Sequence, residues 1–136
     1  MNHAAEGEIP IETEGDIVVA RRTVRDAAAR AGFGVTDVTR IVTAASELAR
    51  NTFQYAGKGL MHWRLLHNNG RRGLELRFVD HGPGIPDVNL AFEQGYSTGQ
   101  GLGMGLPGTK RLMDEMNVQS APGQGTTITV TKWCKV

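Results

Sequence analysis

Two glycine clusters between residues 80 and 108 constrain this chain of 136 residues more than any other feature. The first reads Asp80-His81-Gly82-Pro83-Gly84-Ile85, and the second has glycine at every second position from Gly99 to Gly105. Glycine tolerates positive φ and lets the main chain approach a ligand closely, so alternating glycines before a helix predict a cradle of backbone N–H groups. Such a cradle favours anions, and phosphates above all.

The residues after the second cluster predict a helix over Thr109–Met116, with Pro107 in its first turn, where the missing N–H costs nothing. Lys110 falls in an early turn of this helix, where its ammonium group is a candidate phosphate contact. A glycine-rich linker is the alternative interpretation of the cluster. It is disfavoured because linkers of that kind rarely run straight into an amphipathic helix.

Length and composition predict a single domain over residues 1–136, with residues 1–7 as a frayed polar tail. The formal net charge of +1 gives no sign of a nucleic-acid or membrane partner, since both usually demand a strong basic patch. The single Cys134 fits a reducing compartment. No signal-peptide pattern or membrane-length apolar run is present, so a cytoplasmic location is expected.

Two long helices are expected in the first half of the chain. The first starts near Asp16 and ends at Gly32, a favoured C-cap residue. The second has Thr36 or Asp37 as its N-cap and runs to about Ala56, closed by Gly57. Its apolar residues share one broad face, which Glu47 and Asn51 flank one helical turn apart. A solvated helix edge is the plain interpretation of this pair; beside a phosphate cradle, however, a carboxylate and an amide oxygen suit Mg²⁺-dependent phosphoryl transfer.

Strands are expected on both sides of the glycine clusters. Leu60–His67 and Leu74–Val79 form a hairpin signalled by the Asn69-Gly70 pair, and the second strand ends at Asp80. A carboxylate at that strand end can accept a hydrogen bond from an amino group on a bound base, although an ordinary turn aspartate is the alternative. The remaining strand predictions are Ile9–Thr13, a short segment 118–120 and Thr126–Trp133, while Val88–Thr98 would form a variable lid.

Several other nucleotide and metal motifs are excluded. Residues 103–108 match G-x-G-x-x-G, but no strand directly precedes them and no acidic residue follows about 20 positions on, so a dinucleotide site is rejected. A Walker loop and the signature motifs of eukaryotic-type protein kinases are absent. The four histidines show no metal-ligand spacing, and the presence of a single cysteine argues against a zinc site.

Three blocks in order then define a resemblance: Glu47 to Asn51, Asp80 to Gly84, and Gly99 to Gly105. They resemble the N, G1 and G2 boxes of the GHKL superfamily of ATPases and kinases. Segments 43–51, 55–59 and 103–115 look more narrowly like the RsbT-type serine/threonine switch kinases of bacterial stressosomes. The resemblance implies an α/β (α+β) Bergerat ATP-binding fold, a two-layer sandwich with a mixed, largely antiparallel sheet and helices on one face.

The resemblance also implies roles for individual residues. Glu47 would be the general base, Asn51 would coordinate Mg²⁺, and Asp80 would hold the adenine amino group. Thr126 would lie near the base, and Gly82 and Gly84 would let the base lie against the backbone. The lid contacts to the phosphates would come from Gly99, Gly101, Leu102, Gly103, Met104, Gly105 and Leu106.

Family substrates are STAS-domain antagonist and scaffold proteins of a stressosome, and the released kinase activates a downstream serine phosphatase. The resemblance therefore implies an ATP-dependent serine/threonine protein kinase with these partners. Two alternatives stay open: an anti-sigma factor kinase that holds a sigma factor, and a binding module in which nucleotide only sets the conformation.

Overall fold

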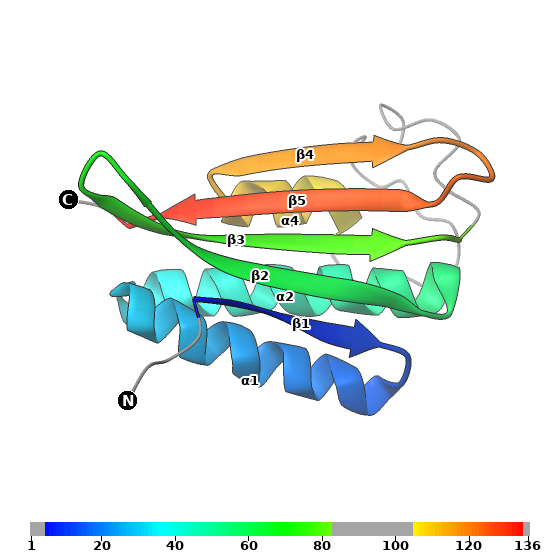
Figure 1. The fold of residues 1–136 in the computed structure, drawn as a ribbon, viewed down its shortest axis with the longest axis horizontal. Coiled ribbons are helices and arrows are strands. Elements are labelled where there is room, and N and C mark those ends of the chain that lie inside the picture. Colours follow the sequence, from blue (N-terminus) through cyan, green and yellow to red (C-terminus); the bar gives the residue numbers. More distant parts are fainter. Residues whose placement is uncertain (1–4, 83–104, 135–136) are drawn as a thin grey trace.

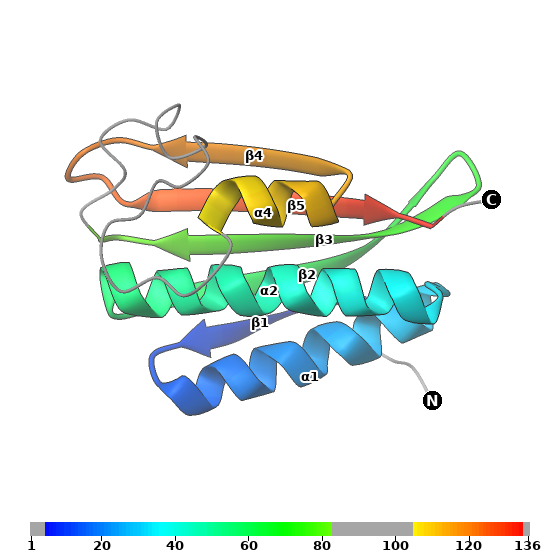
Figure 2. The ribbon, with the colours of Figure 1, turned by 180° about the vertical axis from the view of Figure 1, so that it is seen from behind.

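The computed structural model describes residues 5–82 and 105–134. These residues form a two-layer sandwich in which three helices cover one face of a five-stranded sheet (Figure 1, Figure 2). The chain order is β1 (Glu6–Ile11), α1 (Glu14–Ala31), α2 (Val35–Ala56), β2 (Gly59–Asn68), β3 (Arg71–Asp80), α4 (Gly105–Leu112), β4 (Glu115–Ser120) and β5 (Thr126–Trp133). The expected fold class is confirmed.

The strands lie in the order β1-β2-β3-β5-β4. Every pairing between the described strands is antiparallel, so the prediction of a mixed sheet is wrong for this part of the chain. Antiparallel sheets commonly leave one face to water. The face without helices carries charged cross-strand pairs, such as Arg64 with Glu75 at 3.2 Å.

The β2–β3 hairpin confirms the Asn-Gly signal. Asn69 and Gly70 both have positive φ, 54° and 80°, which a two-residue loop of the I′ kind requires. Because the loop is this short, the strands extend further than expected, and β2 pairs with β3 from Gly59↔Asp80 to Asn68↔Arg71.

Local capping sets the bounds of α1. The Thr13 side chain accepts a hydrogen bond from the backbone N–H of Asp16, and the Asp16 carboxylate accepts one from the Thr13 backbone. This capping box starts the helix two residues before the expected Asp16. Gly32 ends the helix with φ 97°, as predicted. Among the described helices, none is long and apolar enough to cross a membrane.

The other two helices differ from expectation at their ends. Helix α2 begins at Val35 with Gly34 as N-cap, so Thr36 and Asp37 are not caps; the Asp37 carboxylate instead pairs with Arg40 at 3.0 Å. Helix α4 begins earlier than predicted and stops at Leu112. The predicted continuation to Met116 is wrong because residues 115–120 form β4 and pair with β5.

The N-terminal tail is shorter than predicted. Glu6 and Gly7 were expected to be frayed, yet they lie in β1 and pair with Arg64 and Trp63. A Cβ atom at Gly7 would lie 2.7 Å from the Trp63 indole nitrogen, so the absence of a side chain lets the edge strand pass over this ring.

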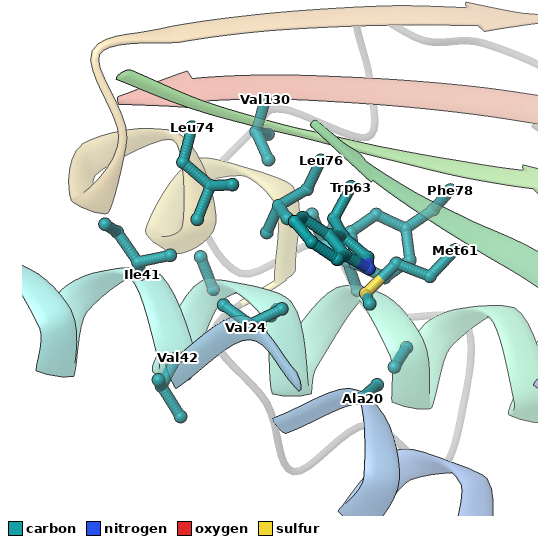
Figure 3. Close-up of a cluster of buried hydrophobic side chains, with 14 of the residues drawn as sticks. Ala20, Val24, Ile41, Val42, Met61, Trp63, Leu74, Leu76, Phe78 and Val130 are labelled. Atoms are coloured by element: carbon teal, nitrogen blue, oxygen red, sulfur yellow. The ribbon is translucent and has the colours of Figure 1, made fainter. Parts of the chain in front are cut away.

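The hydrophobic core fills the space between the sheet and the helices. In Figure 3, Leu74, Leu76 and Phe78 lie on the side of β3 that faces Ile41 of α2 and Val24 of α1. Leu74, Leu76, Ile41 and Val24 are fully buried. This packing fixes α2, the helix that carries Glu47 and Asn51, against the centre of the sheet.

Candidate functional site

Glu47 and Asn51 lie where the sequence places them, at the margin of the buried face of α2. Their neighbours Leu48 and Thr52 are buried, whereas both polar residues are partly exposed. The Glu47 side chain retains 15% exposure and its Oε1 lies 3.2 Å from Nη1 of Arg50. The carboxylate is therefore held by a partner on its own helix and remains accessible from solvent.

The ends of four strands form a single row beside the last turns of α2. Gly59 pairs with Asp80, Asp80 with Thr126, and Thr126 with Ser120. Figure 2 shows the C-terminal end of α2 at the same end of the molecule as the ends of β3 and β4 and the start of β5. Helix α2, which carries Glu47 and Asn51, and strand β3, which ends at Asp80, thus meet at one edge of the sandwich.

Two glycines allow this close approach. A Cβ atom at Gly59 would collide with the side chain of Thr52, so β2 passes directly beneath α2. A Cβ atom at Gly82 would lie 2.7 Å from the Cβ of Ala56 and 3.0 Å from its Cα. The turn after β3 therefore packs against α2, and a side chain at residue 82 would have to displace the helix backbone.

The Asp80 carboxylate organises the same turn. Its Oδ1 accepts a hydrogen bond from the backbone N–H of Gly82 at 2.9 Å. Gly125, with φ 80°, is packed so tightly on Asp80 that a Cβ atom would collide with the Asp80 carbonyl oxygen. One carboxylate oxygen thus stabilises the turn, and Oδ2 is a candidate acceptor for a ligand.

Thr126 lies beside Asp80 on β5 and is 7% exposed. Its hydroxyl shares a hydrogen bond of 2.8 Å with the hydroxyl of Ser120, and the Ser120 hydroxyl donates to the carbonyl oxygen of Gly125 at 3.1 Å. Sequence reasoning singled out Thr126 and missed Ser120. No signal marks Ser120 in the sequence except a hydroxyl at the end of a short strand, because its relevance comes from the strand register.

Helix α4 packs near α2 and begins at Gly105, whose φ is 69°. Thr109 is fully buried and donates a hydrogen bond to the carbonyl oxygen of Gly105 at 3.0 Å. Leu106 is 6% exposed and belongs to the core, so only its backbone is available to a phosphate. Lys110 lies on the exposed side of the helix.

The remaining predicted site positions lie outside the described residues. They are Gly84, Gly99, Gly101, Leu102, Gly103 and Met104, together with the predicted lid segment 88–98.

The antiparallel sheet backed on one face by helices is the architecture that the GHKL resemblance implies. Residues 9–132 match the family model described as the histidine kinase-like ATPase domain. The chain is also 50% identical over 127 residues to the serine/threonine-protein kinase RsbT of Bacillus subtilis, covering 93% of this chain and 96% of that one. The chain belongs to the histidine kinase-like ATPase family and to its RsbT-type serine/threonine kinases.

More distant relatives agree with this assignment. An anti-sigma F factor of Caldanaerobacter subterraneus is 31% identical over 120 residues, covering 84% of this chain and 82% of that protein. Among solved structures, the RsbU and RsbW domains of a Mycobacterium tuberculosis protein match with a TM-score of 0.63 at 20% identity, covering 95% of this chain and 32% of that chain. The mycobacterial sensor histidine kinase MprB matches with a TM-score of 0.57 at 19% identity, covering 94% of this chain and 97% of that chain. The two structural matches support the fold alone.

Family membership and the RsbT relationship make this chain an enzyme, an ATP-using serine/threonine protein kinase.

Proposed function

We propose that this kinase binds Mg-ATP at the edge where α2 meets the strand ends, and transfers the terminal phosphoryl group to a serine or threonine of a STAS-domain protein. The observation that carries the proposal is the packing of the Asp80–Gly82 turn against Ala56, near the C-terminal end of α2, the helix on which Glu47 and Asn51 lie. We also propose that residues 1–136 act as a single domain in the cytoplasm, where a lone Cys134 fits the reducing conditions.

Asp80 would recognise the base. The Gly82 N–H holds its Oδ1, so Oδ2 is oriented to accept a hydrogen bond from the amino group of adenine. Gly82 would let the base lie against the backbone, and its lack of a side chain lets this turn pack on Ala56 of α2. Thr126 would complete the site beside the base, as its register with Asp80 supports.

The donors of α2 fit a magnesium ion bound mainly by phosphate. Mg²⁺ usually keeps several waters and takes only one or two protein ligands at nucleotide sites, so the single amide oxygen of Asn51 is a sufficient protein contribution. Mg²⁺ would supply charge neutralisation on the phosphates. We propose that the glycines at 99, 101, 103 and 105, with the backbones of Leu102, Met104 and Leu106 and the ammonium of Lys110, surround the phosphate groups. Gly84, like Gly82, would let the base lie against the backbone.

Glu47 would act as the general base. As the bond between the substrate hydroxyl oxygen and the γ-phosphorus forms, the bond from that phosphorus to the bridging oxygen breaks and ADP leaves. The hydroxyl proton passes to the Glu47 carboxylate. Partial exposure of Glu47 supports this role, since the hydroxyl belongs to another protein and must reach the carboxylate from solvent.

We propose that the substrates are STAS-domain antagonist and scaffold proteins of a stressosome, and that the released kinase activates a downstream serine phosphatase. The 50% identity to RsbT supports this choice. The 31% identity to an anti-sigma F factor favours one alternative, a kinase that also holds a sigma factor.

The test is transfer of labelled phosphate from ATP to STAS-domain proteins encoded near this chain. Replacing Glu47 by Gln keeps the shape of the side chain and removes the base, so we expect the rate to fall about a hundredfold or more. ATP affinity should stay within about twofold, because the base acts in the transition state and not in nucleotide binding.

Glu14→Gln is the matched control, since Glu14 is an exposed glutamate in the first turn of α1. Its transfer rate should equal that of the unmodified chain. Transfer at an unchanged rate in Glu47→Gln would refute the general-base assignment. Capture of a sigma factor with no transfer to any STAS protein would favour the alternative.

A further inference from the structure

Helix α2 carries two ion pairs of the same construction. Nη1 of Arg50 lies 3.2 Å from Oε1 of Glu47, and Nη1 of Arg40 lies 3.0 Å from Oδ1 of Asp37. In both pairs the acid precedes the arginine by three residues. The acid side chains are 15% and 16% exposed, and the arginine side chains are 44% and 45% exposed. Pairs of this kind stabilise a helix only slightly, so we expect the two to contribute equally to the fold.

The two pairs differ in their surroundings. Asp37 lies in the first turn of α2, whereas Glu47 follows ten residues later, about 15 Å along the helix axis. Asn51 is one turn beyond Glu47, and the Asp80–Gly82 turn packs on Ala56 near the end of the same helix. Of the two pairs, the one at Glu47 is therefore nearer the proposed nucleotide site.

Arg50 and Asn51 lie on opposite flanks of Glu47. Successive residues of a helix are about 100° apart, so Asn51 projects about 40° to one side of Glu47 and Arg50 about 60° to the other. The Arg50 guanidinium donates a hydrogen bond to Oε1 of Glu47. This bond draws the carboxylate toward the flank that faces away from Asn51.

The direction of this pull matters if Asn51 binds Mg²⁺. Carboxylate oxygens are hard ligands that suit this ion, so an unrestrained Glu47 would compete for the ion held by Asn51. A carboxylate bound to a divalent cation is a poorer proton acceptor, because the cation attracts the same lone pairs. We propose that Arg50 is a positioning residue that keeps the Glu47 carboxylate away from the magnesium ion and available as the general base. This inference rests on the proposed function.

The test measures transfer of labelled phosphate to a STAS-domain protein and, separately, ATP affinity by calorimetry in the presence of Mg²⁺. We expect Arg50→Gln to slow transfer about tenfold, because misplacement of a catalytic group costs rate. ATP affinity should be retained or should rise, since the released carboxylate can add a ligand to the bound ion. Arg50→Lys keeps a cationic donor three residues after Glu47 and should transfer within about threefold of the original rate.

Arg40→Gln is the matched control, because it removes the equivalent pair from the same helix. It should leave the transfer rate unchanged, and its urea unfolding midpoint should match that of Arg50→Gln. Both substitutions place a good helix former at an exposed position, so both variants should fold. In a Glu47→Gln background, Arg50→Gln should not slow transfer further, since the residue acts through the carboxylate.

Three results would overturn the positioning role of Arg50. They are an unchanged transfer rate in Arg50→Gln, a loss of ATP affinity as large as the loss of rate, and an equal loss of rate in Arg40→Gln. Full transfer by Glu47→Gln would instead overturn the proposed general base, so the two failures are distinguishable.

Discussion

Replacing Asp80 by Asn should weaken nucleotide binding while leaving the fold intact. In the structure Oδ1 of Asp80 accepts the Gly82 N–H at 2.9 Å, and the amide oxygen of Asn can keep this bond. The amide NH₂ group then replaces Oδ2, so it would present donors to the amino group of adenine. The site loses a hydrogen bond to a charged group, worth about 1.5–3 kcal/mol, which corresponds to about ten- to a hundredfold in ATP affinity.

Calorimetric titration with Mg-ATP measures the loss, and urea unfolding of the same samples checks the fold. The urea midpoint should stay at its original value, since the Gly82 bond is retained. Asp80→Ala removes that bond as well and should lose both affinity and some stability. Glu14→Gln, at an exposed position in the first turn of α1, is the control and should change neither quantity. If Asp80→Asn binds ATP as tightly as the original chain, Asp80 does not recognise the base.

Three further predictions concern packing and the thiol. Gly125→Ala should lower the free energy of unfolding by about 2–4 kcal/mol, measured by urea unfolding. Positive φ is strained for alanine, and the alanine Cβ would collide with the Asp80 carbonyl oxygen. An unchanged urea midpoint would mean that the turn relaxes freely. Lys132→Met should lower the free energy of unfolding by about 1–3 kcal/mol in the same assay. The buried Lys132 ammonium donates a hydrogen bond to the Leu112 carbonyl oxygen at 2.9 Å, which methionine cannot replace. An unchanged free energy of unfolding would show that the contact adds no net stability. Burial raises the pKa of the Cys134 thiol, so less thiolate is present at neutral pH. Alkylation of Cys134 by iodoacetamide should therefore be slower than alkylation of free cysteine. A faster reaction would contradict the raised pKa.

Signals confined to a few neighbouring residues predicted the local structure well. The Asn69-Gly70 pair predicted the hairpin because few other residue pairs tolerate the positive φ that a two-residue loop requires at both positions. Gly32 marked the end of α1 for the same conformational reason. The edge position of Glu47 and Asn51 followed from helical periodicity alone.

Features that depend on pairing between distant segments were not predictable. Met116 fits the helical spacing of the residues before it, yet β4 forms instead because the segment completes the sheet beside β5, with Met116 opposite Val130. Glu6 and Gly7 are polar or small and gave no strand signal, and they are ordered by pairing with β2. Local propensity is a weak prior that tertiary context overrides in such cases.

The candidate site divides in the same way. The sequence singled out Asp80 by its place at a strand end before glycines, and the family resemblance added Thr126 on another strand. Only the register shows that they are direct partners and that Ser120 stands next to Thr126. The close packing of Gly82 on Ala56 likewise depends on the position of α2 over the sheet, which the residues on either side of Gly82 do not encode.

The central claim is that one nucleotide site lies at the edge where α2 meets the ends of the strands. Titration of the unmodified chain with ATP in the presence of Mg²⁺, followed by calorimetry, tests it most directly. The account predicts a single saturable binding event that is lost in Asp80→Ala. No uptake of ATP by the unmodified chain, with or without an added STAS-domain protein, would contradict it.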